Sequence, residues 1–163
     1  MSASLILRSA TPEDVSTLFE LIQALAEYEK LSHEVTGSAL ALKEHLFGSP
    51  NYAQAILAEY DGKAVGFALF FRNYSTFLTQ PGIHLEDLFV FPEFRGLGIG
   101  KAILTKLAKL AVEQGCGRLE WTVLDWNESA IGFYQRMGAT VLPDWRICRV
   151  TGESLIHLAA KGL

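Results

Sequence analysis

A short run of alternating glycines is the segment of the chain in which residue types and spacing first indicate chemistry. It reads Arg95-Gly96-Leu97-Gly98-Ile99-Gly100-Lys101 and stands between an apolar run and an expected helix. Glycine lets a backbone approach another molecule closely, and the free N–H groups at a helix N-terminus bind phosphate. Arg95 can add a bidentate contact to an anion and Lys101 a point charge. The spacing leaves two interpretations open, a phosphate site and a plain tight turn.

Two common phosphate-binding patterns do not fit this segment. A Walker A loop requires glycine at position 95 and serine or threonine at position 102, where this chain has Arg95 and Ala102. A dinucleotide fingerprint requires G-x-G-x-x-G, whereas these glycines alternate and no acid follows at the expected strand end. The pattern therefore favours neither a P-loop nor a Rossmann turn.

The elements that position this segment follow from hydrophobic periodicity and turn residues. Thr11, Pro12 and the acids after them predict the start of a helix that runs to about Lys30. An Asp-Gly pair at 61–62 predicts a tight hairpin turn, and Asn127 predicts the start of a late helix. The expected strands are 5–10, 52–60, 63–74, 82–91, 118–124 and one or two short strands within 140–160 before a last helical turn. The expected helices are 12–30, 36–47, 99–114 and 128–137.

This order, β-α-α-β-β-β-α-β-α-β, predicts an α/β fold with a mixed, mostly antiparallel central sheet flanked by helices. The early hairpins exclude a fully parallel doubly wound sheet. No repeat, low-complexity tract or Pro/Gly-rich linker divides the sequence, so residues 1–163 are expected to form a single domain.

Composition and charge exclude several classes of function. Half of the residues are hydrophobic, and 18 acidic against 14 basic side chains give a net charge of −4, which disfavours nucleic acid and anionic lipid as partners. No stretch reaches the ~20 apolar residues of a membrane span, and the N-terminus lacks a signal-peptide pattern, so we expect a cytoplasmic protein. Cys116 and Cys148 are expected to be buried thiols. The four histidines lack ligand spacing, so no metal site is expected.

The glycine segment, read as R-x-x-G-x-G before a long helix, resembles the acetyl-CoA pyrophosphate loop of the GNAT N-acetyltransferases. The resemblance extends over essentially the whole chain through HLEDLFVFPEFRGLGIG, VLDWNESAIGFYQRMGA, LAEYEKL and NYSTF. These blocks are similar to the diamine, or spermidine/spermine-type, branch, and VLDWN and YST look most like its thialysine-acetylating relatives. The resemblance implies the GNAT fold and acetyl-CoA as cosubstrate, with no metal.

The resemblance also implies which residues bind acetyl-CoA. The glycine turn would bind the pyrophosphate, and the end of the preceding strand would pair with the pantetheine arm as an added strand does. The implied cofactor-binding residues are Leu88, Phe89, Val90, Arg95, Gly96, Leu97, Gly98, Ile99, Gly100, Lys101, Asn127, Glu128, Ser129, Ala130 and Phe133.

Acetyl transfer to an amine requires removal of a proton from the ammonium and return of one to the departing thiolate. The resemblance implies Glu86 as the base, acting through water, and Tyr134 as the acid. Strand alternation puts Glu86 and Asp87 on opposite faces unless the strand is bulged. Without the resemblance, Glu86 as an ordinary strand-edge carboxylate and Tyr134 as a core residue are the alternative interpretations.

The residues that would recognise the amine are Tyr28, Glu29, Asp87, Asp144 and Trp145, again by resemblance. Residues 75–77, Ser-Thr-Phe, replace the acid-Pro-Trp of true polyamine acetylators, and the missing carboxylate should weaken recognition of long polyamines. We therefore expect a small primary amine, a thialysine- or lysine-like amino acid or a short diamine, attacked directly in a ternary complex. Alternatives are a protein or peptide N-acetyltransferase and a non-catalytic acyl-CoA-binding sensor. The branch generally forms homodimers.

Overall fold

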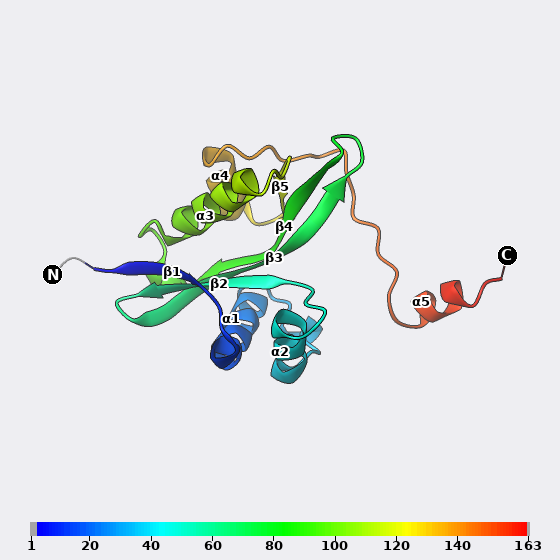
Figure 1. The fold of residues 1–163 in the computed structure, drawn as a ribbon, viewed down its shortest axis with the longest axis horizontal. Coiled ribbons are helices and arrows are strands. Elements are labelled where there is room, and N and C mark those ends of the chain that lie inside the picture. The colour runs from blue at the N-terminus through cyan, green and yellow to red at the C-terminus, as the bar shows by residue number, and fades with distance from the viewer. Residues whose placement is uncertain (1–2, 163) are drawn as a thin grey trace. The chain divides into compact units, whose positions relative to one another are not determined.

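The structure is a computed structural model that describes residues 3–162 (Figure 1). In chain order its elements are β1 (Leu5–Ser9), the 3-10 turn η1 (Pro12–Asp14), α1 (Val15–Tyr28), η2 (Ser32–Glu34), α2 (Ala39–Phe47), β2 (Gln54–Tyr60), β3 (Lys63–Ser75), β4 (Gln80–Val90), η3 (Pro92–Phe94), α3 (Ile99–Glu113), β5 (Leu119–Glu120), α4 (Glu128–Arg136) and α5 (Gly152–Ala159). They form two compact units that divide between Thr122 and Val123.

The first unit contains a five-stranded sheet with the strand order β1-β2-β3-β4-β5. The pairs β1–β2, β2–β3 and β3–β4 are antiparallel, and β5 is parallel to β4. The hairpin between β2 and β3 turns at Asp61 and Gly62, whose φ angles are 51° and 78°. Tight two-residue hairpin turns of type I′ require positive φ angles at both of these positions. The mixed, mostly antiparallel sheet predicted from the sequence is therefore confirmed.

Helices α1 and α2 lie on one side of the sheet and α3 on the other (Figure 1). A buried cluster joins Leu18 and Leu21 of α1 to Leu57, Phe67 and Phe89 of the strands. The α3 stripe that faces the sheet is buried at Ile99, Ile103, Leu104, Leu107 and Ala111. Because each strand alternates its side chains between the two layers, the sheet is held on both faces and gives β4 a fixed position.

Strand β5 pairs with β4 over only two residues, Leu119 with Ile83 and Glu120 with His84. The sequence predicted a strand through residue 124, but beyond Glu120 the chain leaves β4 and continues as coil. From Leu85 to Val90, β4 therefore has β3 on one side and no strand on the other within the described residues. This separation opens one edge of β4 directly before the glycine turn.

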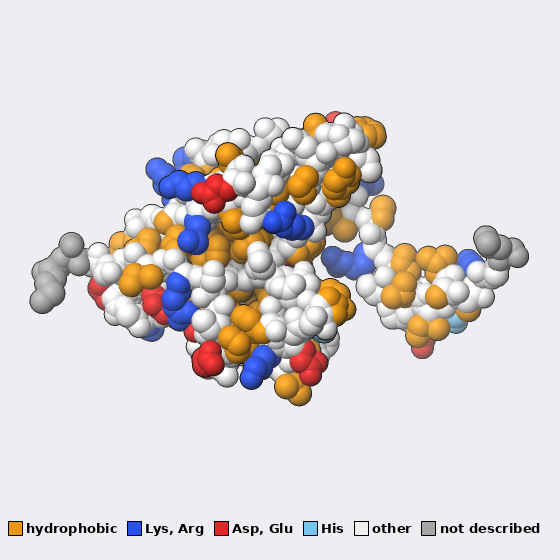
Figure 2. All heavy atoms as spheres, viewed as in Figure 1, with side chains coloured by type: hydrophobic (Ala, Val, Ile, Leu, Met, Phe, Trp, Pro, Cys, Tyr) orange, Lys and Arg blue, Asp and Glu red, His pale blue; other side chains and the backbone are white. Residues whose placement is uncertain are grey.

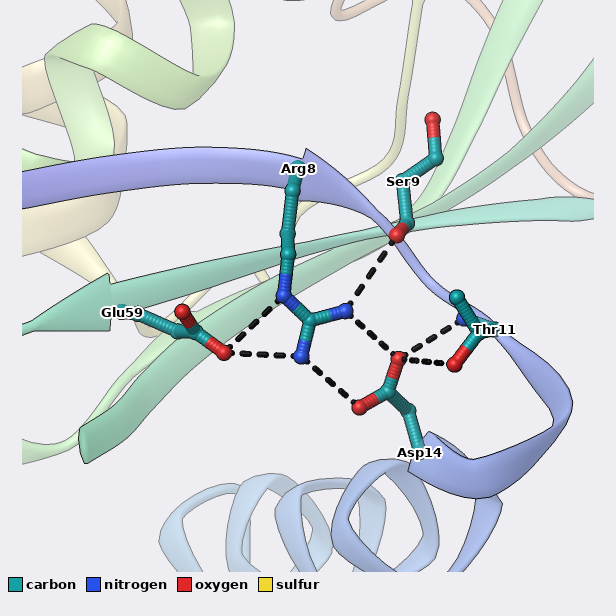
Figure 3. A network of polar contacts seen from close by, with 5 residues as sticks. All are labelled: Arg8, Ser9, Thr11, Asp14 and Glu59. Atoms are coloured by element: carbon teal, nitrogen blue, oxygen red, sulfur yellow. Dashed lines mark hydrogen bonds and ion pairs between the residues drawn. The ribbon is translucent and has the colours of Figure 1, made fainter. Parts of the chain in front are cut away.

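An ion-pair network ties the start of α1 to the sheet (Figure 3). The Arg8 guanidinium on β1 donates to both carboxylate oxygens of Asp14, at 2.7 and 2.9 Å, and to Glu59 Oε1 on β2 at 2.7 Å. Asp14 also accepts from the Thr11 N–H at 2.7 Å. Hydrogen bonds from Arg8 hold the pKa of the Asp14 carboxyl well below its usual range. The predicted helix start at Thr11 is thus present as a cap on η1.

The second unit contains α4 and α5 joined by an extended segment. Asn127 caps α4, as predicted, because its Oδ1 accepts from the Ala130 N–H at 3.2 Å. The strand predicted within 140–160, the last in the expected order, was wrong, because residues 139–150 pair with no strand in the described chain. The last helical turn predicted there is confirmed as helix α5, Gly152–Ala159. The β-branched residues within 139–150 favour a strand, but a strand needs a neighbouring backbone to satisfy its N–H and C=O groups.

Several further features bear on the expectations from composition. Cys116 is partly buried and Cys148 is exposed, so the prediction of two buried thiols was wrong for Cys148. No helix within residues 3–162 is long and apolar enough to cross a membrane. In the same part of the chain, no three His, Cys, Asp or Glu side chains are grouped so that they could hold a metal ion.

Candidate active site

The glycine turn has the backbone geometry that an anion site requires. Gly96 and Gly98 have φ angles of 79° and 81°, in the left-handed region that favours glycine. Gly98 is the N-cap of α3, and its carbonyl accepts from the Ala102 N–H at 2.9 Å. The amides of residues 99–101 precede this first helical bond, and α3 has no acid in its first turn and no side-chain cap. These amides are therefore available to an anion at the positive end of the helix dipole.

Arg95 contacts the protein more closely than the sequence indicated. Its Nε donates to the Val90 carbonyl at 2.9 Å. The guanidinium lies 4.3 Å from the centre of the Tyr28 ring and 5.6 Å from that of Phe89, both within cation–π range. Arg95 therefore connects the glycine turn to the end of β4 and to the end of α1.

The end of β4 presents Leu88, Phe89 and Val90 at the edge that β5 leaves open. Phe89 is buried in the core, and its ring packs 6.4 Å from the Tyr28 ring and 5.6 Å from the Phe91 ring. Core packing fixes the backbone here, while the open edge can pair with an extended ligand as a further strand would. This arrangement fits the role that the resemblance implied for these three residues.

A β-bulge brings the two candidate carboxylates of β4 together. Leu69 and Phe70 are adjacent on β3, yet they pair with Asp87 and Leu85, so Glu86 is the additional residue of the bulge. A bulge interrupts the alternation of side chains. The bulge therefore allows the side chains of Glu86 and Asp87 to face the same side of the strand. Bulges of this kind are frequent beside active sites.

The two carboxylates have different surroundings. The Glu86 side chain is 55% exposed, and its Oε2 lies 3.5 Å from Nε2 of His84. Asp87 is partly buried opposite Leu69, which packs on the core cluster. Burial raises the pKa of Asp87 to about 7, and the charges of Glu86 and Glu29 also raise it. Asp87 is therefore a carboxyl that exchanges its proton near neutral pH.

The end of α1 contributes Tyr28 and Glu29 to the same region. Glu29 is the C-cap of α1, and burial raises the pKa of its carboxyl. The charge of Glu29 also raises the pKa of Asp87, although less than burial and the charge of Glu86 do. Glu29 on α1 and Glu86 on β4 thus each add negative potential at Asp87, which favours a cation there.

The remaining predicted residues lie in the second unit and form a separate set there. Glu128 and Ser129 occupy the first turn of α4 behind the Asn127 cap, with Ala130 donating to that cap. The rings of Phe133 and Tyr134 are 5.5 Å apart and tilted by 52°. Asp144 and Trp145 are exposed in the coil before α5, with Trp145 79% exposed.

Two contacts in the first unit were not predicted from the sequence. The stacking of Arg95 on Tyr28 joins residues far apart in the chain, and no local pattern indicates it. The proximity of His84 to Glu86 has a signal, because residues two apart on a strand share a face. A cavity of about 510 Å³ between α2, β2 and the second half of α3 is lined by none of the predicted site residues.

Comparisons with known proteins agree with this geometry. A model of the acetyltransferase (GNAT) family matches residues 18–139. The chain is 38% identical over 170 residues to a thialysine N-epsilon-acetyltransferase of Sus scrofa, with 98% of this chain and 99% of that protein covered. It is 34% identical over 194 residues to an L-ornithine N5-acetyltransferase of Arabidopsis thaliana, covering 91% of this chain and 85% of that protein. An integron cassette protein from the mobile metagenome of V. cholerae superimposes with a TM-score of 0.80 at 25% identity, covering 97% and 99% of the two chains.

Proposed function

Since the chain belongs to the acetyltransferase (GNAT) family, and is thus an N-acetyltransferase, we propose that it acetylates a primary amine of a small molecule. Proteins of this family use acyl-CoA. The donor in our proposal is acetyl-CoA, and the acceptor is a thialysine- or lysine-like amino acid or a short diamine. The observation that carries the proposal is the end of β4, where an open strand edge, a bulge with two carboxylates and the glycine turn follow one another.

The residues of the first unit fit acetyl-CoA. Backbone amides at the start of α3, with Lys101 beside them, would bind the pyrophosphate. The open edge at Leu88, Phe89 and Val90 would pair with the pantetheine arm, and an N–H near Phe89 or Val90 would donate to the thioester oxygen. The residues Asn127, Glu128, Ser129, Ala130 and Phe133 complete the proposed cofactor set.

The chemistry of the proposal is direct attack of the amine on the thioester carbonyl. The ammonium first gives a proton to a carboxylate, since a protonated amine has no lone pair for attack. The family resemblance assigns this base to Glu86 and the recognition of substrate charge to Asp87. It assigns to Tyr134 the proton for the departing thiolate. The N–C bond forms as the C–S bond breaks, and no covalent acyl-enzyme intermediate is required.

The size of the acceptor is inferred from the residues around the amine channel and from the relatives. Tyr28, Glu29, Asp144 and Trp145 are the proposed contacts besides Asp87. The related proteins are named for thialysine and for L-ornithine, both short amino acids with a terminal amine. With Ser-Thr-Phe at residues 75–77, we propose that this chain prefers such acceptors to long polyamines.

An amine panel tests this proposal. Release of free thiol from acetyl-CoA is measured with thialysine, lysine, ornithine, short diamines, spermidine and aminoglycosides. The expected result is a higher kcat/KM for the short amino acids and diamines than for spermidine. Absence of thiol release with every amine contradicts the proposed function.

Two alternatives are separated by the same assay. A protein or peptide N-acetyltransferase prefers a lysine-containing peptide to free amines. A non-catalytic sensor binds coenzyme A in a calorimetric titration but releases no thiol. The presence of a carboxylate with a pKa of about 7 beside the open edge favours catalysis over sensing.

We also propose that residues 1–163 act as one catalytic domain and that the protein is a homodimer. The family match at residues 18–139 covers most of the first unit and continues through α4 of the second, which supports a single functional domain. The second unit exposes Trp145, Ile147, Ile156 and Leu158, and hydrophobic side chains cover much of the visible surface of α5 in Figure 2. Exposed apolar groups of this extent are typical of interaction surfaces. Light scattering of the full chain decides between monomer and dimer.

A further inference from the structure

His84 lies beside Glu86 on β4, and its ring is held against the neighbouring strand. Nε2 of His84 is 3.5 Å from Oε2 of Glu86. The imidazole ring packs 4.9 Å from the ring of Phe71, its cross-strand partner on β3, with an angle of 31° between the two rings. The side chain of His84 is 24% exposed, compared with 55% for Glu86. The imidazole is therefore the more firmly held member of this pair.

The backbone of β4 is also held more firmly at His84 than at Glu86. At His84 the strand pairs with β3 on one side and, through Glu120, with β5 on the other. Glu86 is the additional residue of the bulge and has no partner in the β3–β4 register. An exposed glutamate side chain samples several rotamers unless another group restrains it, whereas a general base must stay within hydrogen-bond reach of the proton that it accepts. Glu86 therefore needs a restraint, and His84 lies where it can provide one.

A second carboxylate, that of Glu120 on β5, competes for His84, because the two residues are partners in the parallel β4–β5 ladder. Glu120 already has two other partners. Nδ2 of Asn73 donates to Oε1 of Glu120 at 3.3 Å, and Nη1 of Arg118 lies 3.6 Å from its Oε2. Groups on β3 and next to β5 thus hold Glu120 in place, and the imidazole of His84 serves Glu86.

We propose that His84 is a positioning residue that orients the carboxylate of Glu86 for its role as the proposed base. This inference rests on the proposed acetyltransferase function and on the base assigned there. An imidazole with a proton on Nε2 donates to a carboxylate whether the ring is neutral or charged. Contact with Oε2 leaves Oε1 of Glu86 for the water that carries the proton from the substrate ammonium. The distance of 3.5 Å is long for a hydrogen bond, and such contacts at catalytic groups often shorten when substrate binds.

Two substitutions in the full-length protein separate the ring of His84 from its nitrogen donor. His84→Phe keeps a ring against Phe71 and loses the donor, whereas His84→Gln loses the ring and keeps an N–H donor of similar reach. With the best amine of the panel, His84→Phe should lower kcat about tenfold to 10²-fold and leave KM for acetyl-CoA unchanged. His84→Gln should recover most of the lost kcat. A kcat as low in His84→Gln as in His84→Phe would show that the ring, rather than the donor, matters and would overturn the inference.

A double-mutant cycle with Glu86→Gln tests whether His84 acts through Glu86. His84→Phe should have little further effect on kcat in the Glu86→Gln background, because the carboxylate that His84 positions is gone. An equal fold-loss in both backgrounds overturns the inference, since the effects of independent residues multiply. A wild-type kcat in Glu86→Gln also overturns it and removes Glu86 from the role of base. If His84→Phe does not fold, His84→Asn, whose side chain is too short to reach Glu86, takes its place in the cycle.

His45→Phe is the matched control for the loss of an imidazole. His45 is exposed on α2, and its ring also contacts an aromatic ring, that of Tyr52 at 5.3 Å, so this variant should keep the wild-type kcat. Thermal unfolding and calorimetric binding of coenzyme A, each close to wild type, verify that the His84 variants are folded. An inactive wild type overturns the proposed function together with this inference. An active wild type with equal fold-losses in the two backgrounds of the cycle overturns this inference alone.

Discussion

The guanidinium of Arg95 lies 4.3 Å from the centre of the Tyr28 ring, and its Nε donates to the Val90 carbonyl. One side chain thus joins the turn proposed to bind pyrophosphate to the residue proposed to line the amine channel. A planar guanidinium can stack on a ring and hydrogen-bond at its edge at the same time, whereas a lysine ammonium cannot. The two proposed substrate sites therefore share a structural support.

Arg95→Lys tests that shared support. The variant keeps the positive charge but loses the stacking and the fork of donors, an effect of about 0.5–2 kcal/mol. We expect KM to rise about twofold to thirtyfold for acetyl-CoA and for the amine alike. Steady-state kinetics with each substrate varied in turn measures both values. The control is Lys101→Ala, which should affect acetyl-CoA only, and a rise confined to acetyl-CoA in Arg95→Lys would contradict the coupling.

Gly98→Ala tests the glycine turn through its backbone. A left-handed φ of 81° strains alanine by about 1 kcal/mol and should misplace the amides at the start of α3. We expect at least about a tenfold loss of coenzyme A affinity by calorimetry. Gly62→Ala is the matched control, because Gly62 has a φ of 78° and open space at its Cβ position, but lies in the β2–β3 turn. Gly62→Ala should lose a similar amount of stability and keep its affinity for coenzyme A. An equal loss of affinity in both variants would show that the glycine turn is not part of the coenzyme A site.

Much of the fold could be predicted because it depends on local rules. The cap at Thr11, the turn at 61–62 and the ends of α4 each follow from interactions among residues close in the chain. The alternating glycines likewise indicated a turn, because glycine readily adopts positive φ angles. The structure has such angles at Gly96 and Gly98.

The features that could not be predicted depend on partners distant in the chain. The bulge at Glu86 arises from the register between β3 and β4, which no spacing within β4 specifies. The early end of β5 after Glu120 depends on where it leaves β4, and the coil at 139–150 depends on the absence of a strand beside it. The sequence therefore indicated the two candidate carboxylates, but not that the bulge leaves Glu86 exposed and Asp87 partly buried.

Tyr134→Phe tests the proposed acid. The change removes one hydroxyl and keeps the ring that packs 5.5 Å from Phe133. Without a proton donor for the thiolate, turnover should fall by about 10²-fold or more, while coenzyme A binding stays the same. Tyr74→Phe, at an exposed tyrosine of β3, is the control and should leave turnover unchanged. Wild-type turnover in Tyr134→Phe would exclude this residue from proton transfer.

Asp14→Asn tests the network at the start of α1 (Figure 3). Arg8 holds the pKa of Asp14 below its usual range, so this stabilisation is present above about pH 4 and is lost as pH falls below it. At neutral pH the variant should lose about 1–2 kcal/mol, a discounted value because Arg8 is partly exposed. Thermal unfolding at neutral pH and at about pH 2.5 measures the difference, which should be clearly smaller in acid, because the stabilisation declines progressively as the pH falls from about 4 toward the lowered pKa of Asp14. Glu13→Gln is the exposed control, and an equal loss at both pH values would refute the ion-pair origin.

Asp87→Asn should stabilise the free protein at alkaline pH although it removes a carboxylate of the proposed amine site. The folded-state pKa of about 7 is above the ordinary value, so ionising Asp87 costs nothing below about pH 4, costs progressively more up to about pH 7, and then stays constant. At pH 8 the variant should therefore unfold at a higher temperature than wild type, with a free energy of unfolding that is larger by a few kcal/mol at most. At pH 4 the two proteins should unfold at nearly the same temperature. Glu44→Gln, exposed on α2, should show no such dependence. An equal difference in unfolding temperature at both pH values would mean that packing, rather than the buried charge, distinguishes the variant from wild type. A difference that grows with pH identifies a carboxylate kept at the expense of stability, as functional groups commonly are.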